Sequence, residues 1–402
     1  MINVTLEDVK KAAEVLDGVI SKTKLMECNA LSTISGNNVY LKLENLQKTG
    51  SFKIRGAYNK IASLTEEERN NGVIASSAGN HAQGVALGAK MNNIKATIVM
   101  PATAPLAKVS NTRAYGAEVV LNGTVYDDAY AKAVELQKET GATFLHPFND
   151  PYVIAGQGTI ALEILDEVKD MDAIMVPIGG GGIVAGIAVA AKAINPDIKI
   201  IGVEAAGAAS MKAAVAKGEV VELDKAATIA DGIAVKKAGD LTFEIVQKYV
   251  DEIVTVEEEE IAQAILFLME KDKIVAEGSG AVCAAALMNN KVNMKGKKIA
   301  AVVSGGNIDV NMVARIIDKA LMKEGRRFFF KTMLPDAPGQ MSKITGILAE
   351  MKANIFSISQ TRFRDDIGIG NQQAEIMIET FGAEHKAEII AALEKAGYVL
   401  QY

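Results

Sequence analysis

The stretch AIMVPIGGGGIVAGIAVAA, residues 173–191, decides the fold. It carries no charge and is nearly long enough to cross a bilayer. Pro177 and four consecutive glycines interrupt it, which predicts a strand, a loop and a helix instead of a membrane span. Bare backbone N–H groups at a helix start can hold a phosphate, and a Cβ would block that approach. We therefore predict a phosphate-binding loop, with a close helix–strand crossing as the alternative, at Gly179, Gly180, Gly181 and Gly182.

Outward from this loop, short β-branched runs alternate with segments of helical period between residues 39 and 304. That alternation predicts an α/β fold with parallel strands flanked by helices. The expected strands are Val39–Glu44, Val73–Ala75, Ala96–Met100, Glu118–Leu121, Ile174–Ile178, Ile198–Val203, Ile253–Val256 and Ile299–Val303. Ligands bind beyond the carboxyl ends of such strands. Three strand ends therefore become candidate sites: Ser76–Gly84, Gly179–Gly182 and Ser304–Asn307.

A second domain is expected after a charged, glycine-containing hinge at residues 323–327. The first domain would then cover residues 1–322, in two α/β subdomains, and the second residues 328–402. Strand and helix patterns in the second follow the order βαββαβ, which is ferredoxin-like. These patterns lie at Phe328–Leu334, Gln340–Lys352, Ile355–Phe363, Gln372–Thr380, Glu384–Ala396 and Tyr398–Tyr402.

Composition narrows the class of protein. The chain has 402 residues, 49% of them apolar and 23% charged, which describes a globular protein. Its net charge of -6 is spread along the chain, so no basic footprint for nucleic acid is expected. Cys28 and Cys283 are too few for a disulfide framework, and Met1 to Gly18 lacks the pattern of a signal peptide. We expect a cytoplasmic protein without a membrane span.

Local motifs alone leave two kinds of cofactor open. Gly180, Gly182 and Ala185 match G-x-G-x-x-A, and Glu204 ends the next strand where a ribose-binding acid would lie, which favours a dinucleotide. Lys53 lies in SFKIRGA, residues 51–57. A lysine kept uncharged can form a Schiff base with an aldehyde cofactor. Together with a phosphate-binding loop, this lysine indicates pyridoxal 5'-phosphate (PLP).

Four motifs in order, SFKIRGA (51–57), SSAGNHAQG (76–84), GGGG (179–182) and SGGN (304–307), resemble the threonine dehydratases, or threonine ammonia-lyases. These are fold type II PLP enzymes of the tryptophan-synthase-β-like family. The resemblance covers about residues 5 to 322. The C-terminal segment resembles a regulatory ACT domain.

The resemblance implies a role for each matching residue. Lys53 would hold PLP and remove the Cα proton of the substrate, and Phe52 would pack against the cofactor ring. Asn80 would bind the phenolic oxygen, Ser304 the pyridine nitrogen, and the amides of Gly179 to Gly182 the phosphate. The substrate carboxylate would be bound by Ser76, Ser77, Gly79, Asn80 and His81.

The implied reaction is β-elimination of L-threonine, and of L-serine, to 2-oxobutanoate or pyruvate and ammonia. The resemblance further implies a homotetramer and an amino-acid effector, with isoleucine inhibiting and valine relieving. The effector would be bound by Asp336, Pro338, Gly339 and Asn354. A nicotinamide-dependent oxidoreductase and a non-catalytic amino-acid sensor are the alternatives.

Three further positions bear on racemisation, on metal binding and on the surroundings of the cofactor. Serine racemases of the family carry a second acid/base serine where this chain has Ala78, so racemisation should be poor. No second carboxylate follows Glu204 within residues 205–210, so the metal found in some relatives stays unknown here. Glu277 matches a position near the cofactor, with helix capping as the alternative role.

Overall fold

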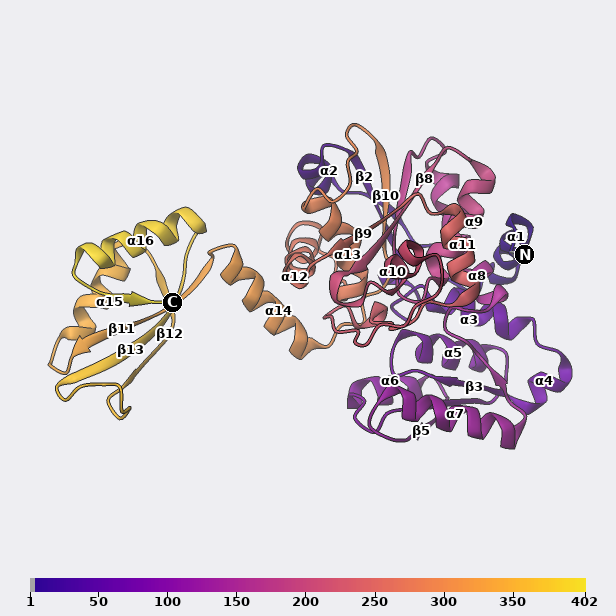
Figure 1. Ribbon diagram of the computed structural model, residues 1–402, viewed down its shortest axis with the longest axis horizontal. Coiled ribbons are helices and arrows are strands. Elements are labelled where there is room, and N and C mark those ends of the chain that lie inside the picture. Colours follow the sequence, from indigo (N-terminus) through magenta and orange to yellow (C-terminus); the bar gives the residue numbers. More distant parts are fainter. Residues whose placement is uncertain (1–3) are drawn as a thin grey trace. The chain divides into compact units, whose positions relative to one another are not determined.

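A computed structural model describes residues 4–402; Met1 to Asn3, the start of the segment expected to lack a signal peptide, lie outside the described residues. Contacts divide the chain into two compact units, one ending at Asp309 and the other comprising Val310–Tyr402 (Figure 1). The helix before the expected hinge thus groups with the C-terminal unit by contacts. The predicted boundary at residue 322 remains a prediction.

The larger of the two sheets in the N-terminal unit has the strand order β1-β2-β10-β7-β8-β9. Its neighbours are parallel except for β1, which pairs antiparallel with β2. Parallel pairing of β2 with β10 joins segments about 260 residues apart, Val39 opposite Ile299. The strands are β1 (Leu25–Glu27), β2 (Asn38–Leu43), β7 (Ala173–Pro177), β8 (Lys199–Ala205), β9 (Glu252–Val256) and β10 (Lys298–Val303).

A second, four-stranded parallel sheet has the order β5-β4-β3-β6. It comprises β3 (Val73–Ser76), β4 (Ala96–Met100), β5 (Glu118–Leu121) and β6 (Thr143–Phe144). In Figure 1 it lies below the six-stranded sheet, with the helices labelled α5, α6 and α7 around it. The strands expected from the sequence are therefore present, but they are divided between two sheets.

Helices cover both sheets. The first begins with the expected capping box, in which Thr5 and Asp8 exchange hydrogen bonds. The helices are α1 (Leu6–Leu16), α2 (Asn29–Ser35), α3 (Lys53–Ala62), α4 (Glu66–Asn71), α5 (Asn80–Met91), α6 (Leu106–Ala114), α7 (Tyr126–Thr140), α8 (Pro151–Glu167), α9 (Gly182–Ile194), α10 (Ser210–Lys217), α11 (Asp240–Tyr249), α12 (Glu258–Phe267) and α13 (Gly278–Met288). Short turns of helix add η1 (Glu44–Leu46), η2 (Ala206–Ala208), η3 (Asp231–Ile233) and η4 (Leu268–Asp272).

Glycines let three helices of this unit cross very closely. A Cβ on Gly156 of α8 would lie 2.7 Å from the Cα of Gly56 on α3. A Cβ on Gly186 of α9 would lie 2.2 Å from the carbonyl oxygen of Ile154 on α8. Real Cβ contacts are longer than these, so backbone packs on backbone at both crossings. Helix α3, which begins at Lys53, is thereby fixed against α8, and α8 in turn against α9.

Charged side chains buried beside α3 fix it further. The Arg55 guanidinium donates to both carboxylate oxygens of Glu44, at 2.8 Å each, and to Glu163 at 2.6 and 2.9 Å. Lys42 donates to the same Glu163 at 2.6 Å. Lys42, Glu44 and Arg55 are fully buried, so each charge depends on these partners. The network ties β2, η1, α3 and α8 together.

The C-terminal unit begins with α14 (Val310–Lys323) and continues as a four-stranded antiparallel sheet of order β12-β13-β11-β14. Its elements are β11 (Arg327–Pro335), α15 (Gln340–Glu350), β12 (Asn354–Thr361), β13 (Asn371–Glu379), α16 (Ala383–Lys395) and β14 (Leu400–Gln401). The expected βαββαβ order is confirmed. Phe330, Leu334, Ile344, Ile376 and Ile389 form its buried core.

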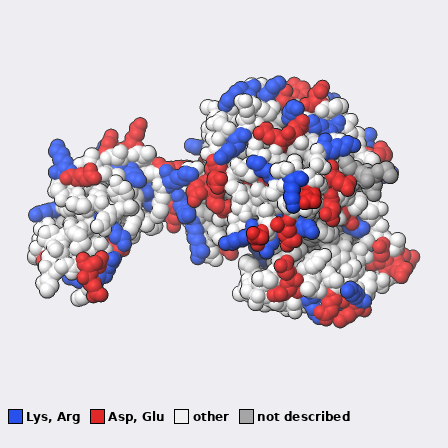
Figure 2. Space-filling model, viewed as in Figure 1, with Lys and Arg blue, Asp and Glu red and all other residues white. Residues whose placement is uncertain are grey.

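The uncharged segment 173–191 is β7, a glycine loop and α9, as the sequence predicts. Among residues 4–402, no helix is both long and apolar enough to cross a membrane. On the face drawn in Figure 2, basic and acidic side chains are interspersed.

Candidate active site

Lys53 is the first residue of α3 and lies beside the carboxyl end of β10. The amide of Phe52 donates to the carbonyl oxygen of Ser304 at 3.1 Å, and Ser51 forms an isolated β-bridge with Gly305. Two motifs about 250 residues apart in sequence are thus held together by backbone hydrogen bonds. Phe52 is buried, and its ring centroid lies 5.1 Å from the Lys53 amine.

The Lys53 amine is enclosed by the protein. Its Nζ donates to the carbonyl oxygen of Pro147 at 3.2 Å. Burial lowers the pKa of Lys53 to about 8, and the carboxylate of Glu277 opposes that shift. The neutral amine, the form that can act as a nucleophile or a base, is therefore far more populated near physiological pH than in an exposed lysine.

The glycine loop joins β7 to α9. Gly181 is the N-cap of α9 with a φ of 94°, a left-handed conformation that favours glycine. A Cβ on Gly180 would lie 2.3 Å from ring carbons of Phe148, and one on Gly182 2.9 Å from its Cβ. The first N–H groups of α9 have no acceptor within the helix. This loop can therefore bind an anion, and glycine is also required by its contact with Phe148.

The predicted substrate loop connects β3 with α5. Ser76 is buried, and its hydroxyl has no hydrogen-bond partner within residues 4–402. Gly79 is the N-cap of α5, and no side chain caps that helix start. His81 is turned inward, with Nε2 2.8 Å from the carbonyl oxygen of Leu145. Burial, followed by the charge of Lys53, lowers the pKa of His81 to about 3, so this ring is neutral.

A chain of polar side chains leads from Asn80 to Ser304. The Asn80 amide donates to Glu277 at 2.7 Å, while its oxygen accepts from Asn307 at 2.8 Å. Ser279 also donates to Glu277, at 2.5 Å, and the Ser304 hydroxyl donates to the carbonyl oxygen of Ser279 at 3.2 Å. The amide of Asn80 is thereby fixed in orientation.

Glu277 is the N-cap residue of α13, but its carboxylate bonds to side chains instead of capping the helix. Burial, with the nearby charge of Asp231, raises its pKa to about 7. A carboxyl group that titrates near neutrality beside a buried lysine is typical of a functional site. The role that the sequence left open for Glu277 is therefore side-chain positioning within the site.

The carboxylate of Glu204 is already occupied by backbone groups of the protein, so it is not available to bind a ribose. Both its oxygens accept backbone N–H groups, from Met211 at 2.9 Å and Lys212 at 2.8 Å. It thus caps the start of α10. Burial raises its pKa to about 7. No group of three or more His, Cys, Asp or Glu residues placed to hold a metal occurs among residues 4–402.

The structure therefore brings together Lys53, Phe52, Asn80, Ser304, the glycine loop and the Ser76–His81 segment. Sequence reasoning missed Phe148, His146 and Asn307 as parts of the same site. Phe148 and His146 follow β6, a strand of two residues that is too short to be recognised from the hydrophobic pattern of the sequence. Asn307 lay within a quoted motif, but nothing in the sequence indicated its bond to Asn80.

The four predicted effector residues do not lie together in one chain. Asp336, Pro338 and Gly339 follow the end of β11, whereas Asn354 opens β12 at the opposite end of the sheet. The register places Asn354 and Arg327 both opposite Glu379. A single chain therefore presents these residues as two separate groups.

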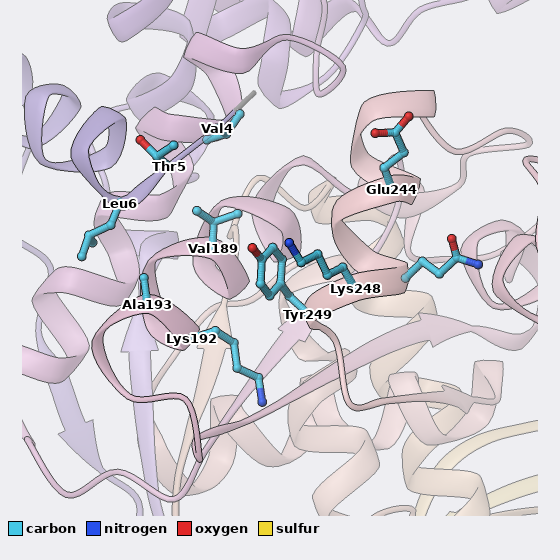
Figure 3. A pocket seen from close by; sticks show the side chains of 10 residues that line it. Val4, Thr5, Leu6, Val189, Lys192, Ala193, Glu244, Lys248 and Tyr249 are labelled. Atoms are coloured by element: carbon cyan, nitrogen blue, oxygen red, sulfur yellow. The ribbon is translucent and has the colours of Figure 1, made fainter. Parts of the chain in front are cut away.

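A cavity of 820 Å³ lies away from all of these residues, between α1, α9 and α11. Figure 3 shows Val189, Lys192, Lys248 and Tyr249 around it. None of the candidate catalytic or cofactor-binding residues lines this cavity.

A family model described as pyridoxal-phosphate dependent enzyme matches residues 16–305, and one described as ACT domain matches residues 328–397. The chain therefore belongs to the family of pyridoxal-phosphate-dependent enzymes and carries a C-terminal ACT domain. Its cofactor is PLP. No comparison supports a dinucleotide.

Relatives narrow the class further. The chain is 54% identical over 395 residues, 98% of each chain, to an L-threonine ammonia-lyase of Thermotoga maritima. It is 48% identical over 322 residues to an L-threonine dehydratase of Staphylococcus aureus, covering 79% of this chain and 93% of that one. The solved processed form of threonine deaminase isoform 2 from Solanum lycopersicum matches with a TM-score of 0.75 and 42% identity, covering 79% of this chain and 87% of that one.

The residues present fit PLP. A buried lysine of lowered pKa can capture its aldehyde, and the uncapped start of α9 can hold its phosphate. The hydroxyl of Ser304 and the amide of Asn80 belong to one chain of hydrogen bonds through Glu277 and Ser279.

Proposed function

We propose that the protein catalyses the PLP-dependent β-elimination of L-threonine to 2-oxobutanoate and ammonia, and that of L-serine to pyruvate. The observation that carries this proposal is the buried Lys53 amine, placed between the uncapped starts of α5 and α9. Full-length similarity to an L-threonine ammonia-lyase supports threonine as the substrate.

Lys53 would bind the cofactor and then take the proton from the α-carbon of threonine. A pKa of about 8 suits this step, because the neutral amine is available and its protonated form can release the proton again. The Nζ contact with the carbonyl oxygen of Pro147 orients the amine. When bound, PLP supplies the conjugated ring that delocalises charge from the α-carbon.

The substrate carboxylate would bind at the start of α5. The hydroxyl of Ser76 lacks a partner, and the first N–H groups of α5, from Asn80 onward, have no acceptor within the helix. Ser77 and Gly79 form the turn that places these donors. His81 supports the turn from inside, since its Nε2 already contacts Leu145.

Ser304 would place a hydroxyl, not a carboxylate, at the pyridine nitrogen. A neutral donor withdraws less charge from the ring than a carboxylate partner that keeps this nitrogen protonated. A short-lived carbanion favours prompt loss of the β-hydroxyl as water. Asn80 would meet the phenolic oxygen in an orientation set by Glu277 and Asn307.

The proposal extends to location and regulation. Cys28 and Cys283 are free and buried, which supports a cytoplasmic location. We propose a homotetramer whose ACT domains bind an aliphatic amino acid, with isoleucine inhibiting and valine relieving. Unchanged kinetics with either amino acid would contradict this regulation.

The test is the visible absorbance of the purified PLP-loaded protein before and after L-threonine. We expect an absorbance band that changes on addition while 2-oxobutanoate accumulates. Lys53→Ala should remove both signals. Lys60→Ala, which changes a lysine near the other end of α3, should retain them. A band that does not respond to threonine would contradict the proposed substrate.

A further inference from the structure

The imidazole of His146 lies in the segment between β6 and α8, close to the reactive amine. Lys53 Nζ donates to the carbonyl oxygen of Pro147, the next residue in the chain, at 3.2 Å. The ring of Phe148 meets the imidazole edge to face at a centroid distance of 4.6 Å, and the same ring packs against the glycine loop. The residues that follow His146 therefore contact both the amine and the loop.

Backbone hydrogen bonds fix which nitrogen of the His146 ring carries the proton. Nδ1 accepts the N–H of Asn149 at 2.8 Å and that of Phe148 at 3.3 Å. Burial, followed by the charge of Lys53, lowers the pKa of His146 to about 4, so the ring is neutral near physiological pH. A neutral imidazole has a single N–H, and because Nδ1 is an acceptor, that N–H is on Nε2.

The Nε2–H of His146 has no hydrogen-bond acceptor within residues 4–402. The side chain is half-buried, and Nε2 is not one of the fully buried polar atoms that lack a partner. A small molecule can therefore reach it. A donor whose direction is fixed by the backbone, and which has no acceptor in the protein, is suited to an acceptor on a ligand.

His81 is the other histidine whose pKa is lowered by the charge of Lys53. Its ring is neutral too, with a pKa of about 3, and its Nε2 donates to the carbonyl oxygen of Leu145 at 2.8 Å. The single N–H of His81 is therefore already used within the protein. Of these two rings, only that of His146 can donate to a substrate.

The proposed substrate offers one acceptor to this donor. Its amino nitrogen goes to the cofactor and its carboxylate to the start of α5, which leaves the β-hydroxyl. The β-carbon is bonded directly to the carbon from which Lys53 takes the proton, so the hydroxyl also lies close to this amine. An uncharged N–H suits an uncharged hydroxyl oxygen, whereas a charged imidazolium beside the amine would be repelled by its protonated form.

We propose that the Nε2–H of His146 donates a hydrogen bond to the β-hydroxyl oxygen of the substrate, an inference that rests on the proposed function. His146 then selects amino acids that have a β-hydroxyl over those that lack one, and it orients the hydroxyl for departure. The imidazole keeps its proton throughout, so the proton that completes the water comes from another group. A single neutral hydrogen bond of this kind changes affinity about three- to tenfold.

The test compares two ligands that differ by one hydroxyl group. Neither α-methyl-L-serine nor 2-aminoisobutyrate has an α-proton, so Lys53 cannot start elimination on either, and only the first has a β-hydroxyl. We expect the PLP-loaded wild-type protein to bind α-methyl-L-serine about three- to tenfold more tightly than 2-aminoisobutyrate. Titration of the visible absorbance band with each ligand measures the two affinities without turnover.

His146→Asn removes this donor and keeps the turn. The asparagine oxygen replaces Nδ1 as the acceptor for the N–H groups of Phe148 and Asn149, but its amide is too short to replace Nε2. The preference for α-methyl-L-serine should disappear, and the affinity for 2-aminoisobutyrate should stay the same. His146→Gln, whose longer amide can replace Nε2–H, should restore part of the preference. His385→Asn, the same substitution in the C-terminal unit, should leave both affinities unchanged.

A second measurement needs neither ligand nor cofactor. The chain has three histidines, so nitrogen NMR of protein with isotope-labelled histidine can resolve each ring, and His146→Asn assigns one set of signals. We expect an unprotonated Nδ1 and a protonated Nε2 for His146 near neutral pH. A proton on Nδ1, or a charged ring, would overturn the proposal.

Three binding results would also overturn the proposal. One is a wild-type protein that does not distinguish the two ligands, and another is an undiminished preference in His146→Asn. The third is an equal loss of affinity for both ligands in that variant, because His146 would then act on the carboxylate or on the fold. A protein that shows the preference but does not turn over threonine would instead contradict the proposed function and support the role of His146.

Discussion

At the residue scale, the decisive group is the amine of Lys53. Burial lowers its pKa from 10.5 to about 8, so folding favours its neutral form. Only the neutral amine can attack an aldehyde. We therefore predict that apoprotein captures PLP at a rate that rises with pH and reaches half its limit near pH 8, as measured by stopped-flow absorbance.

Glu277→Gln provides a sharper version of this test. The Glu277 carboxylate raises the pKa of Lys53, so its removal should move the midpoint to lower pH. A midpoint near 10.5 in the wild-type protein, the value of an exposed lysine, would contradict the burial of this amine.

Ala78 determines a second prediction at this scale. It lies half-buried in the turn between β3 and α5, packed against the core of the four-stranded sheet. A methyl group cannot deliver a proton, so wild-type protein incubated with L-serine should form pyruvate with little D-serine. Ala78→Ser should increase the D-serine fraction in chiral chromatography. Substantial D-serine from the wild-type protein would exclude this interpretation.

At the scale of elements, glycine permits the close crossing of α8 and α9. A Cβ on Gly186 would lie 2.2 Å from the oxygen of Ile154 and 2.6 Å from the nitrogen of Gly158, and both are backbone atoms. Gly186→Ala must therefore separate the helices. We expect it to destabilise the N-terminal unit by about 1–3 kcal/mol, measured by scanning calorimetry.

Gly346→Ala is the matched control. Gly346 also lies inside a helix, α15, but nothing lies within 4 Å of its added Cβ. This substitution should stabilise the C-terminal unit by up to about 1 kcal/mol, since alanine has the higher helix propensity. Equal effects of the two substitutions on stability would show that the close helix crossing does not cause the destabilisation by Gly186→Ala.

At the scale of the whole catalytic unit, an ion pair joins helix α6 to the short turn η3 near the site. Lys108 of α6 bonds to Asp231 of η3 at 2.6 Å. That turn lies against the glycine loop, since a Cβ on Gly179 would be 3.0 Å from the Cα of Ile233. The pair therefore connects α6, which flanks the four-stranded sheet, to the segment next to the glycine loop.

Breaking this pair should weaken substrate binding more than turnover. An exposed pair contributes up to about 1 kcal/mol, so Lys108→Met should raise KM for threonine by about fivefold at most. Exchanging the two charges in Lys108→Asp with Asp231→Lys should restore it. Asp231→Asn should also lower the pKa of Glu277, because the Asp231 charge raises it. Steady-state kinetics against pH measure both effects.

The sequence by itself determined the element order, and the family resemblance of its motifs indicated the cofactor class and the candidate site residues. Local patterns suffice for the element order, because β4 and β5 match their expected hydrophobic runs residue for residue. The roles of Lys53 and Ser304 stay predictions from their motif positions.

Only the tertiary structure decided which strands share a sheet and which side chains meet. The parallel pairing of β2 with β10, the contact of Phe148 with the glycine loop, and the Glu277 bond to Asn80 all join segments distant in the chain. Such contacts leave no local periodicity in the sequence. The pKa of Lys53 belongs to this class too, because burial by those distant segments lowers it.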